Sequence, residues 1–146
     1  MDRLEAGEAV RRAVRTQGRR WSELAELLGR SVVWTTSALL GQQPLGREQA
    51  ELVAKELSLG QEVVEGLCLP PVRGAAAVDR SEPVVYRLEE VVQVYGSAVA
   101  ELVAEEFGDG IMSAIDFEMD LRRESDPKGD RVVLTLSGKF LPYRVW

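Results

Sequence analysis

The sequence predicts an α+β protein in which five short helices form a bundle and one long helix then leads into a β-hairpin. Up to Leu69, apolar residues recur at helical spacing in short segments that end at glycines or loops. Residues 84–107 keep one apolar face at steps of three and four, which indicates a long amphipathic helix that ends near Phe107, before the turn Gly108-Asp109-Gly110. Two segments with the pattern of strands follow it, at residues 111–122 and 131–136.

The bundle is predicted from short amphipathic segments with tight turns between them. Gly18, Gly29 and Gly41 follow the first three segments and indicate where those helices end. Ser31 precedes the third helix, where its hydroxyl can accept a backbone N–H of the first turn. The five predicted helices cover residues 2–17, 21–28, 32–40, 47–57 and 61–69.

A break between two domains is predicted at Pro70 and Pro71, because proline interrupts helical hydrogen bonding. Residues 72–83 then contain a glycine, three alanines and Pro83, a composition typical of an extended linker. We therefore expect a helical bundle at residues 1–70 and a second domain at residues 71–146, made of the long helix and the hairpin.

The first predicted strand places one hydroxyl among apolar side chains. A hydroxyl in an apolar phase lies where water is scarce and needs a hydrogen-bond partner, so Ser113 is a candidate functional residue. Residues 125–130 form the predicted turn, and residues 139–142 close the chain after the second strand. The apolar phase of the first strand consists of Ile111, Ser113, Ile115, Phe117, Met119 and Leu121.

The long helix and the hairpin are together too small to form a stable unit alone. A two-stranded hairpin is marginal in water, and three or more strands are usually required. The apolar faces of both elements therefore need cover from another chain. This predicts an oligomer in which the hairpin interlocks with a partner subunit.

The composition excludes several classes of chemistry. The chain has no histidine, which removes the commonest general base and metal ligand, and only one cysteine, so we expect no metal. No glycine-rich phosphate loop occurs either. No apolar run is long enough for a membrane span, and the charged N-terminus lacks the apolar core of a signal peptide. We therefore expect a cytoplasmic protein with no membrane partner.

Residues 22–41 resemble a helix-turn-helix of the phage-repressor type, which makes a DNA-binding regulator an alternative function. DNA binding needs cations that contact phosphates, yet no lysine or arginine occurs at residues 31–43. Residues 1–75 carry ten basic and ten acidic side chains, and residues 76–146 carry eight and fourteen, which gives the net charge of −6. We therefore expect no nucleic-acid partner and an assembly role for this repressor-like bundle.

Arg87 and Glu90 form the most informative local pattern, because a spacing of three places both side chains on one helix face. They belong to a series of short motifs in the same order and spacing as in a known family. The chain closely resembles cyanate hydratase, also called cyanase or cyanate lyase, over nearly its whole length. The matching pieces are Leu39-Leu40-Gly41-Gln42-Gln43, Tyr86-Arg87-x-x-Glu90, Gln93-Val94-Tyr95-Gly96, Phe107-Gly108-Asp109-Gly110-Ile111, Ser113-Ala114-Ile115, Asp126-Pro127 and Gly138-Lys139-Phe140-Leu141-Pro142.

The resemblance implies a lyase that converts cyanate and bicarbonate to carbon dioxide and carbamate, which decays to ammonia and carbon dioxide. It implies no cofactor, with bicarbonate as co-substrate, and a homodecamer of five dimers with active sites between subunits. The family's catalytic arginine, glutamate and serine correspond to Arg87, Glu90 and Ser113. The backbone near Leu141 is expected to line the substrate pocket together with Arg87 and Ser113. Residues 71–146 would then be the catalytic and dimerisation domain.

The chemistry of the side chains agrees with these implied roles. Both substrates are small anions, and a guanidinium offers a permanent charge and a planar fork of donors that suits bicarbonate. Ser113 can donate to a bound anion, and Glu90 can position Arg87 or take part in proton transfer. Glu89, an additional carboxylate, lies about 100° away around the helix and is expected to be peripheral. Two simpler alternatives remain: an exposed Arg87–Glu90 ion pair worth at most ~0.5 kcal/mol, and a serine hydroxyl bonded only to backbone.

Overall fold

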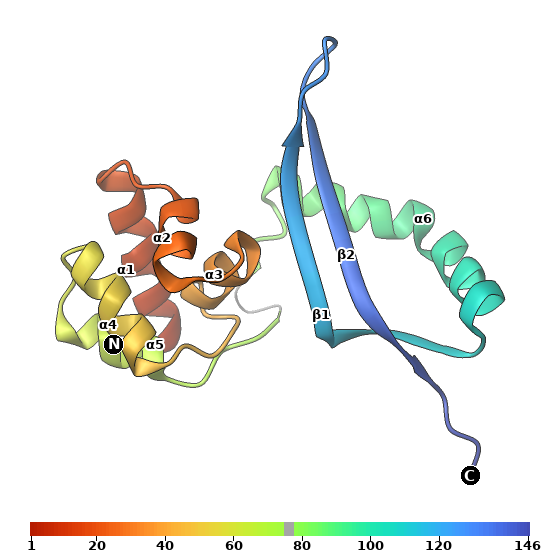
Figure 1. Cartoon of the computed structure of the whole chain (residues 1–146), viewed down its shortest axis with the longest axis horizontal. Coiled ribbons are helices and arrows are strands. Elements are labelled where there is room, and N and C mark those ends of the chain that lie inside the picture. Colours follow the sequence, from red (N-terminus) through yellow and green to blue (C-terminus); the bar gives the residue numbers. More distant parts are fainter. Residues whose placement is uncertain (75–77) are drawn as a thin grey trace. The chain divides into compact units, whose positions relative to one another are not determined.

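The structure is a computed structural model that describes residues 1–74 and 78–146 (Figure 1). Within these residues it contains helices and one two-stranded sheet, which confirms the predicted α+β class. The chain divides into two units, Met1–Val78 with Asp120–Leu134 and Asp79–Met119 with Thr135–Trp146. The elements are α1 (Arg3–Thr16), α2 (Trp21–Leu28), α3 (Val32–Leu39), α4 (Arg47–Glu56), α5 (Gln61–Cys68), α6 (Pro83–Phe107), β1 (Gly110–Glu124) and β2 (Arg131–Pro142).

The helices of the bundle begin and end within one residue of the predicted bounds, because local hydrogen bonds fix their termini. The Asp2 carboxylate accepts the backbone N–H groups of Leu4 and Glu5, both at 2.8 Å. The predicted cap of α3 is confirmed, since the Ser31 hydroxyl accepts the N–H of Trp34 at 3.1 Å. Gly29 ends α2 in the left-handed region with φ 62°.

The bundle buries a continuous apolar core of its own. α5 packs against α1 and α4, and α2 packs against α3 and α4. Cys68 is half-buried and packs against this core as a small apolar residue. The buried members of the core are Ala6, Val10, Ala13, Val14, Leu24, Ala38, Leu39, Leu45, Ala50, Val53, Ala54, Leu57, Val63, Val64 and Leu67.

One charged side chain, Arg3, is also buried in the bundle, with 2% of its surface exposed. Its Nη2 donates to the carbonyl oxygen of Ala38, at the end of α3, and to that of Gln43 at 3.4 Å. A cation near the C-terminus of a helix interacts favourably with the unpaired carbonyls there. Burial lowers the pKa of Arg3, because the charged form loses its hydration.

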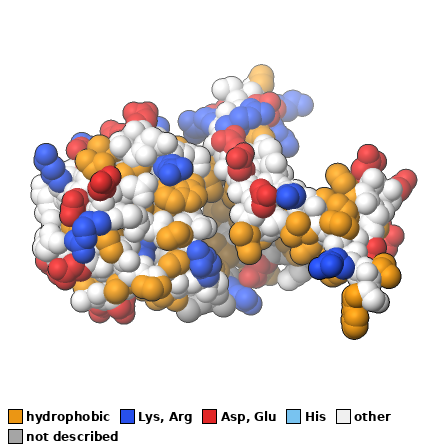
Figure 2. Space-filling view, turned by 60° about the horizontal axis from the view of Figure 1, so that its bottom comes forward, with side chains coloured by type: hydrophobic (Ala, Val, Ile, Leu, Met, Phe, Trp, Pro, Cys, Tyr) orange, Lys and Arg blue, Asp and Glu red, His pale blue; other side chains and the backbone are white. Residues whose placement is uncertain are grey.

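α6 differs from the bundle helices in that none of its residues is buried. The Glu82 carboxylate caps it by accepting the N–H groups of Val84 at 2.8 Å and Val85 at 3.1 Å. Pro83 is its first residue, so the predicted linker ends one residue earlier than expected; residues 75–77 of that linker lie outside the described residues. Many apolar side chains of α6 are exposed, among them Val92, Val99 and Leu102, and apolar side chains are visible at the surface in Figure 2.

β1 and β2 pair with each other as a hairpin. The prediction that the second strand stops at residue 136 is wrong, because β2 continues to Pro142. Glycine and proline are unfavourable inside strands, but Gly138 serves a close approach between the two strands and Pro142 is the final strand residue. None of the helices in the described part of the chain has the length and apolar character that a membrane crossing requires.

Candidate active site

Arg87 and Glu90 lie near the start of α6 and form the predicted pair. Nη1 of Arg87 is 3.1 Å from Oε2 of Glu90. Both side chains are exposed in the single chain, 71% for Arg87 and 53% for Glu90. One of the five guanidinium N–H groups suffices for this bond, so donors remain for a planar anion. The carboxylate thus holds the arginine without occupying all its donors.

Glu89 belongs to a different contact. Its Oε1 lies 3.5 Å from Nε of Arg80, which precedes the helix. This agrees with the prediction that Glu89 is peripheral to the Arg87–Glu90 pair. Of the two neighbouring carboxylates, Glu90 is therefore the one that holds Arg87.

Ser113 is buried, with 6% of its surface exposed, as the sequence predicts. Its Oγ accepts the backbone N–H groups of Ile115 at 3.1 Å and Asp116 at 2.9 Å. The hydroxyl is therefore bonded to backbone, as in the simpler alternative. Both bonds use its lone pairs, however, so its own proton remains available for an acceptor. Two N–H groups directed at Oγ also stabilise negative charge on that oxygen.

The same hydrogen bonds require a bend in β1. A regular strand advances about 3.3 Å per residue, which would hold Ser113 and the N–H of Asp116 too far apart to bond. Figure 1 shows the corresponding corner in β1 close to its start. Within one copy, Ile115 is 98% exposed although Ser113 is buried, so these two residues of the predicted apolar phase differ in burial in the single chain. The Ser113 hydroxyl competes with the regular strand for the backbone N–H groups of Ile115 and Asp116. A β-bulge disturbs the hydrogen bonds of a strand in a similar way.

Leu141 lies at the same end of the hairpin as Ser113. Its carbonyl oxygen is so close to Gly110 that a Cβ atom at residue 110 would collide with it. Phe140 stacks on Phe107, the last residue of α6, with ring centroids 5.2 Å apart. These contacts join the end of α6, the start of β1 and the end of β2, so Leu141 and Ser113 lie at the same end of the hairpin.

The predicted site residues thus form two groups, one near the start of α6 and one on the hairpin. Arg87 and Phe107 are twenty residues apart, a separation of about 30 Å along a helix axis. No hydrogen bond or ion pair joins Arg87 or Glu90 to Ser113 within the described part of the chain. One copy therefore holds the arginine–glutamate group near the start of α6 and, on the hairpin that follows α6, a serine–leucine group made of Ser113 and Leu141.

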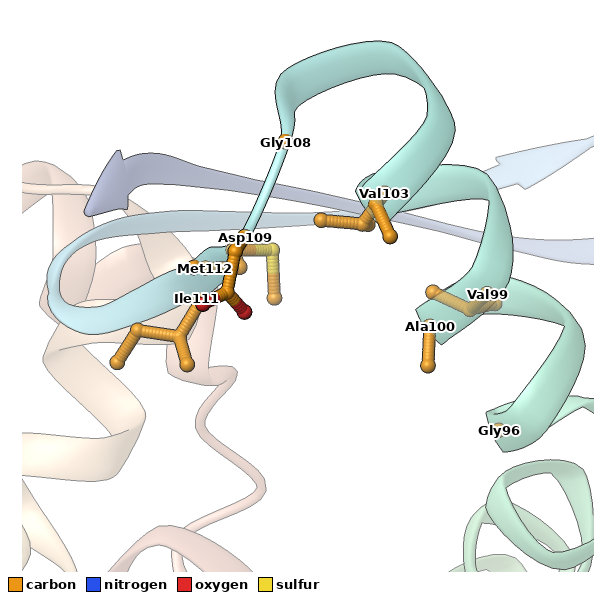
Figure 3. Close-up of a pocket in the computed structure, with 10 residues that line it drawn as sticks. Gly96, Val99, Ala100, Val103, Gly108, Asp109, Ile111 and Met112 are labelled. Atoms are coloured by element: carbon orange, nitrogen blue, oxygen red, sulfur yellow. The ribbon is translucent and has the colours of Figure 1, made fainter. Parts of the chain in front are cut away.

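A cavity of about 400 Å³ lies between the second half of α6 and the start of β1. In Figure 3, Val99 and Val103 from α6 face it across from Ile111 and Met112 of β1. None of the four candidate site residues lines it. Its lining is mainly apolar and suits apolar side chains better than small anions.

Gly110 and Gly138 have structural roles that the sequence analysis does not assign. Both glycines stand where the other strand leaves no room for a Cβ atom. A glycine inside a strand pattern is a signal of close backbone approach, and this signal is present in the sequence.

The fold and the site define an α+β protein with a helical bundle, a long exposed helix and a hairpin, carrying an arginine–glutamate pair and a buried serine hydroxyl. Residues 3–71 match the family model "Cyanate hydratase, N-terminal", and residues 77–145 match "Cyanate lyase C-terminal domain". The chain belongs to the cyanate hydratase family.

Individual relatives agree over most or all of the chain. A cyanate hydratase of Thiobacillus denitrificans is 48% identical, with full coverage of both chains. One of Ralstonia pickettii is 54% identical over 86% of each chain. Cyanase from T. urticae is 35% identical in sequence. Its crystal structure matches this one with a TM-score of 0.82, over 94% of this chain and 97% of that one.

The alternative of a DNA-binding regulator gains no support from these comparisons. Each relative named above is a cyanate hydratase or cyanase. In the bundle, Arg30 lies over the ring of Trp34, with its guanidinium carbon 5.4 Å from the ring centroid.

Proposed function

We propose that this chain catalyses the bicarbonate-dependent decomposition of cyanate to carbamate and carbon dioxide. The observation that carries the proposal is the similarity to cyanate hydratases along the entire chain, 48% identical with full coverage. The Arg87–Glu90 pair and the buried Ser113 hydroxyl support it, because they offer a cation and a hydrogen-bond donor to small anions.

The proposed reaction joins two anions and consumes protons. An oxygen of bicarbonate bonds to the electrophilic carbon of cyanate, and the cyanate nitrogen takes up protons. The bond from the bicarbonate carbon to the bridging oxygen then breaks, which releases carbon dioxide and leaves carbamate. The balance is NCO⁻ + HCO₃⁻ + H⁺ → CO₂ + NH₂COO⁻, and carbamate with a second proton gives ammonia and carbon dioxide.

Each candidate residue has a proposed part in this reaction. Arg87 offsets the repulsion between the two anions and can hold two oxygens of bicarbonate at once. Ser113 donates its free proton in a hydrogen bond to a bound anion in a place with little water. Glu90 fixes the orientation of Arg87 and is a candidate for proton transfer. The backbone at Leu141 lines the pocket beside Ser113.

We propose that a complete site combines the arginine–glutamate group of one copy with the serine–leucine group of another. Two features support this: among the described residues no hydrogen bond or ion pair joins the two groups, and the exposed apolar face of α6 needs cover. The proposed assembly is a homodecamer of five dimers in which hairpins interlock.

Cytoplasmic residence stays a prediction of the sequence, and cell fractionation would test it.

Assembly is expected to show directly in solution. Light scattering should give a mass about ten times that of the 16.2 kDa chain, at micromolar protein. Val99→Glu, which adds a charge to the exposed apolar face of α6, should shift the protein to smaller species, whereas Glu101→Gln on the same helix should not. A stable monomer of the parental chain would contradict both the assembly and the site between subunits.

Activity is expected to need no metal. The chain has no histidine and one cysteine, and the proposed roles need only the guanidinium, hydroxyl and carboxylate groups. Prolonged treatment with a chelator, followed by removal of the chelator, should leave the turnover rate unchanged. Loss of turnover that is restored by one particular metal ion would contradict this expectation.

The activity itself is tested by measuring ammonia release from cyanate with and without bicarbonate. The expected result is release that requires bicarbonate and saturates with both anions. A regulator would instead give no release and would bind DNA with a strong dependence on salt. Absence of ammonia release from correctly assembled protein would contradict the proposed decomposition of cyanate.

A further inference from the structure

Gly138 of β2 lies directly against the Ser113 segment of β1. A Cβ atom at residue 138 would collide with the carbonyl oxygen of Ser113 and with Cγ of Met112, and would lie 3.2 Å from Met112 Sδ. Met112 can move its flexible side chain aside. The carbonyl oxygen belongs to the backbone, however, and moves only together with the strand. β2 therefore approaches β1 here more closely than a residue with a side chain permits.

The requirement for glycine at this position comes from space and not from backbone conformation. The glycines with positive φ in the described residues do not include Gly138. Alanine can therefore adopt the backbone angles found at residue 138. The obstacle to a side chain is the Ser113 segment itself.

The peptide that Gly138 touches belongs to the corner that positions the Ser113 hydroxyl. That corner holds the N–H groups of Ile115 and Asp116 at 3.1 and 2.9 Å from Ser113 Oγ. Among the described residues of the two strands, only Ser113 is buried. Displacing its carbonyl oxygen moves the same residue that carries Oγ, so the hydroxyl loses its position relative to both donors.

We propose that Gly138 is a positioning residue of the active site, which acts through Ser113. By leaving room for the Ser113 carbonyl, it allows the corner in β1 to close and directs the free hydroxyl proton towards the substrate pocket. The catalytic part of this inference rests on the proposed function above. Gly138 contributes to the proposed site by having no side chain.

The test is Gly138→Ala, alone and together with Ser113→Ala. Gly138→Ala should lower kcat about 100-fold, because a displacement of about 1 Å in a catalytic group can have this effect. KM for bicarbonate should change little, since Arg87 is untouched. In the Ser113→Ala background, the same change should lower kcat by no more than about twofold, because the hydroxyl through which Gly138 acts is absent. An equal loss in both backgrounds would overturn the proposal.

Two further variants separate this role from a general effect of an added methyl group. Gly46→Ala is the matched control: Gly46 has φ −74°, and the nearest atom to its added Cβ is Oε1 of Gln49 at 3.6 Å. It should turn over at the parental rate. Adding Met112→Ala to Gly138→Ala removes the side-chain collision but not the carbonyl collision. Full recovery of kcat in that double variant would overturn the proposal, and so would a Gly138→Ala protein that fails to assemble.

A crystal structure of Gly138→Ala provides a readout that does not depend on turnover. At least one of the distances from Ser113 Oγ to the nitrogens of Ile115 and Asp116 should exceed hydrogen-bond range. Unchanged distances of 3.1 and 2.9 Å would overturn the positioning role. If the parental protein released no ammonia from cyanate, the proposed function would fail, while this structural test of Gly138 would still give its own answer.

Discussion

Arg87→Lys is expected to lower cyanate turnover by about 10²–10³-fold while the protein keeps its native oligomeric state. This is the usual cost of removing one preorganised donor to developing charge. Lysine keeps the positive charge but presents a point charge where arginine presents a planar fork, so it cannot hold two oxygens of bicarbonate in one plane. The loss should appear in kcat and also as a higher KM for bicarbonate. Ammonia release at saturating cyanate, with size measured on the same samples, provides the check.

Arg80→Lys is the matched control for this variant. Arg80 is a neighbouring arginine that pairs with Glu89 at 3.5 Å and has no part in the proposed site. It should turn over near the parental rate, because an exposed ion pair contributes little. Glu90→Gln keeps the shape beside Arg87 but removes the charge, so it should also lose turnover. Near-parental turnover in a correctly assembled Arg87→Lys protein would show that the site has been placed on the wrong residue.

Ser113→Ala is expected to raise the activation free energy by about 2–4 kcal/mol, equivalent to roughly 30–900-fold in turnover. The alanine cannot donate to a bound anion in a place that contains little water. It also leaves the N–H groups of Ile115 and Asp116 without their acceptor, which should lower the free energy of unfolding by about 1–3 kcal/mol. Kinetics at 25 °C and denaturant unfolding of the same preparation measure the two effects separately.

Ser137→Ala is the control for the loss of a strand hydroxyl. Ser137 lies in β2, and it is exposed. The change should leave both turnover and stability close to the parental values. Parental turnover in assembled Ser113→Ala would mean that the buried hydroxyl only shapes the strand, as the simpler alternative holds.

The secondary structure could be predicted wherever a local signal decides it. Ser31 caps α3 and Gly29 ends α2 as expected, because these effects act within a few residues of the chain. The extension of β2 to Pro142 could not be predicted in this way. It depends on how Gly138 meets a different strand, and local propensity counts glycine against a strand. Likewise, the corner at Ser113 breaks a period of two that the apolar pattern alone continues through Ile115.

The candidate site could be predicted from the sequence only in part. The spacing of Arg87 and Glu90 predicts their contact, and the apolar phase predicts the burial of Ser113. The sequence could not show that Ser113 Oγ accepts two N–H groups and so keeps its proton for another acceptor. Its role as a donor depends on the backbone conformation of the next three residues, and a pattern of side chains does not specify that conformation.

The contrast between the bundle and α6 has a consequence for how active protein arises during synthesis. The bundle buries its core from its own helices, whereas no residue of α6 is buried within one copy. The bundle also leaves the ribosome first, and domains generally fold as units in that order. In the proposed assembly, the second half of each nascent chain then pairs with another copy, and the rate of that encounter depends on concentration. Active protein should therefore accumulate more than proportionally with the rate of its translation.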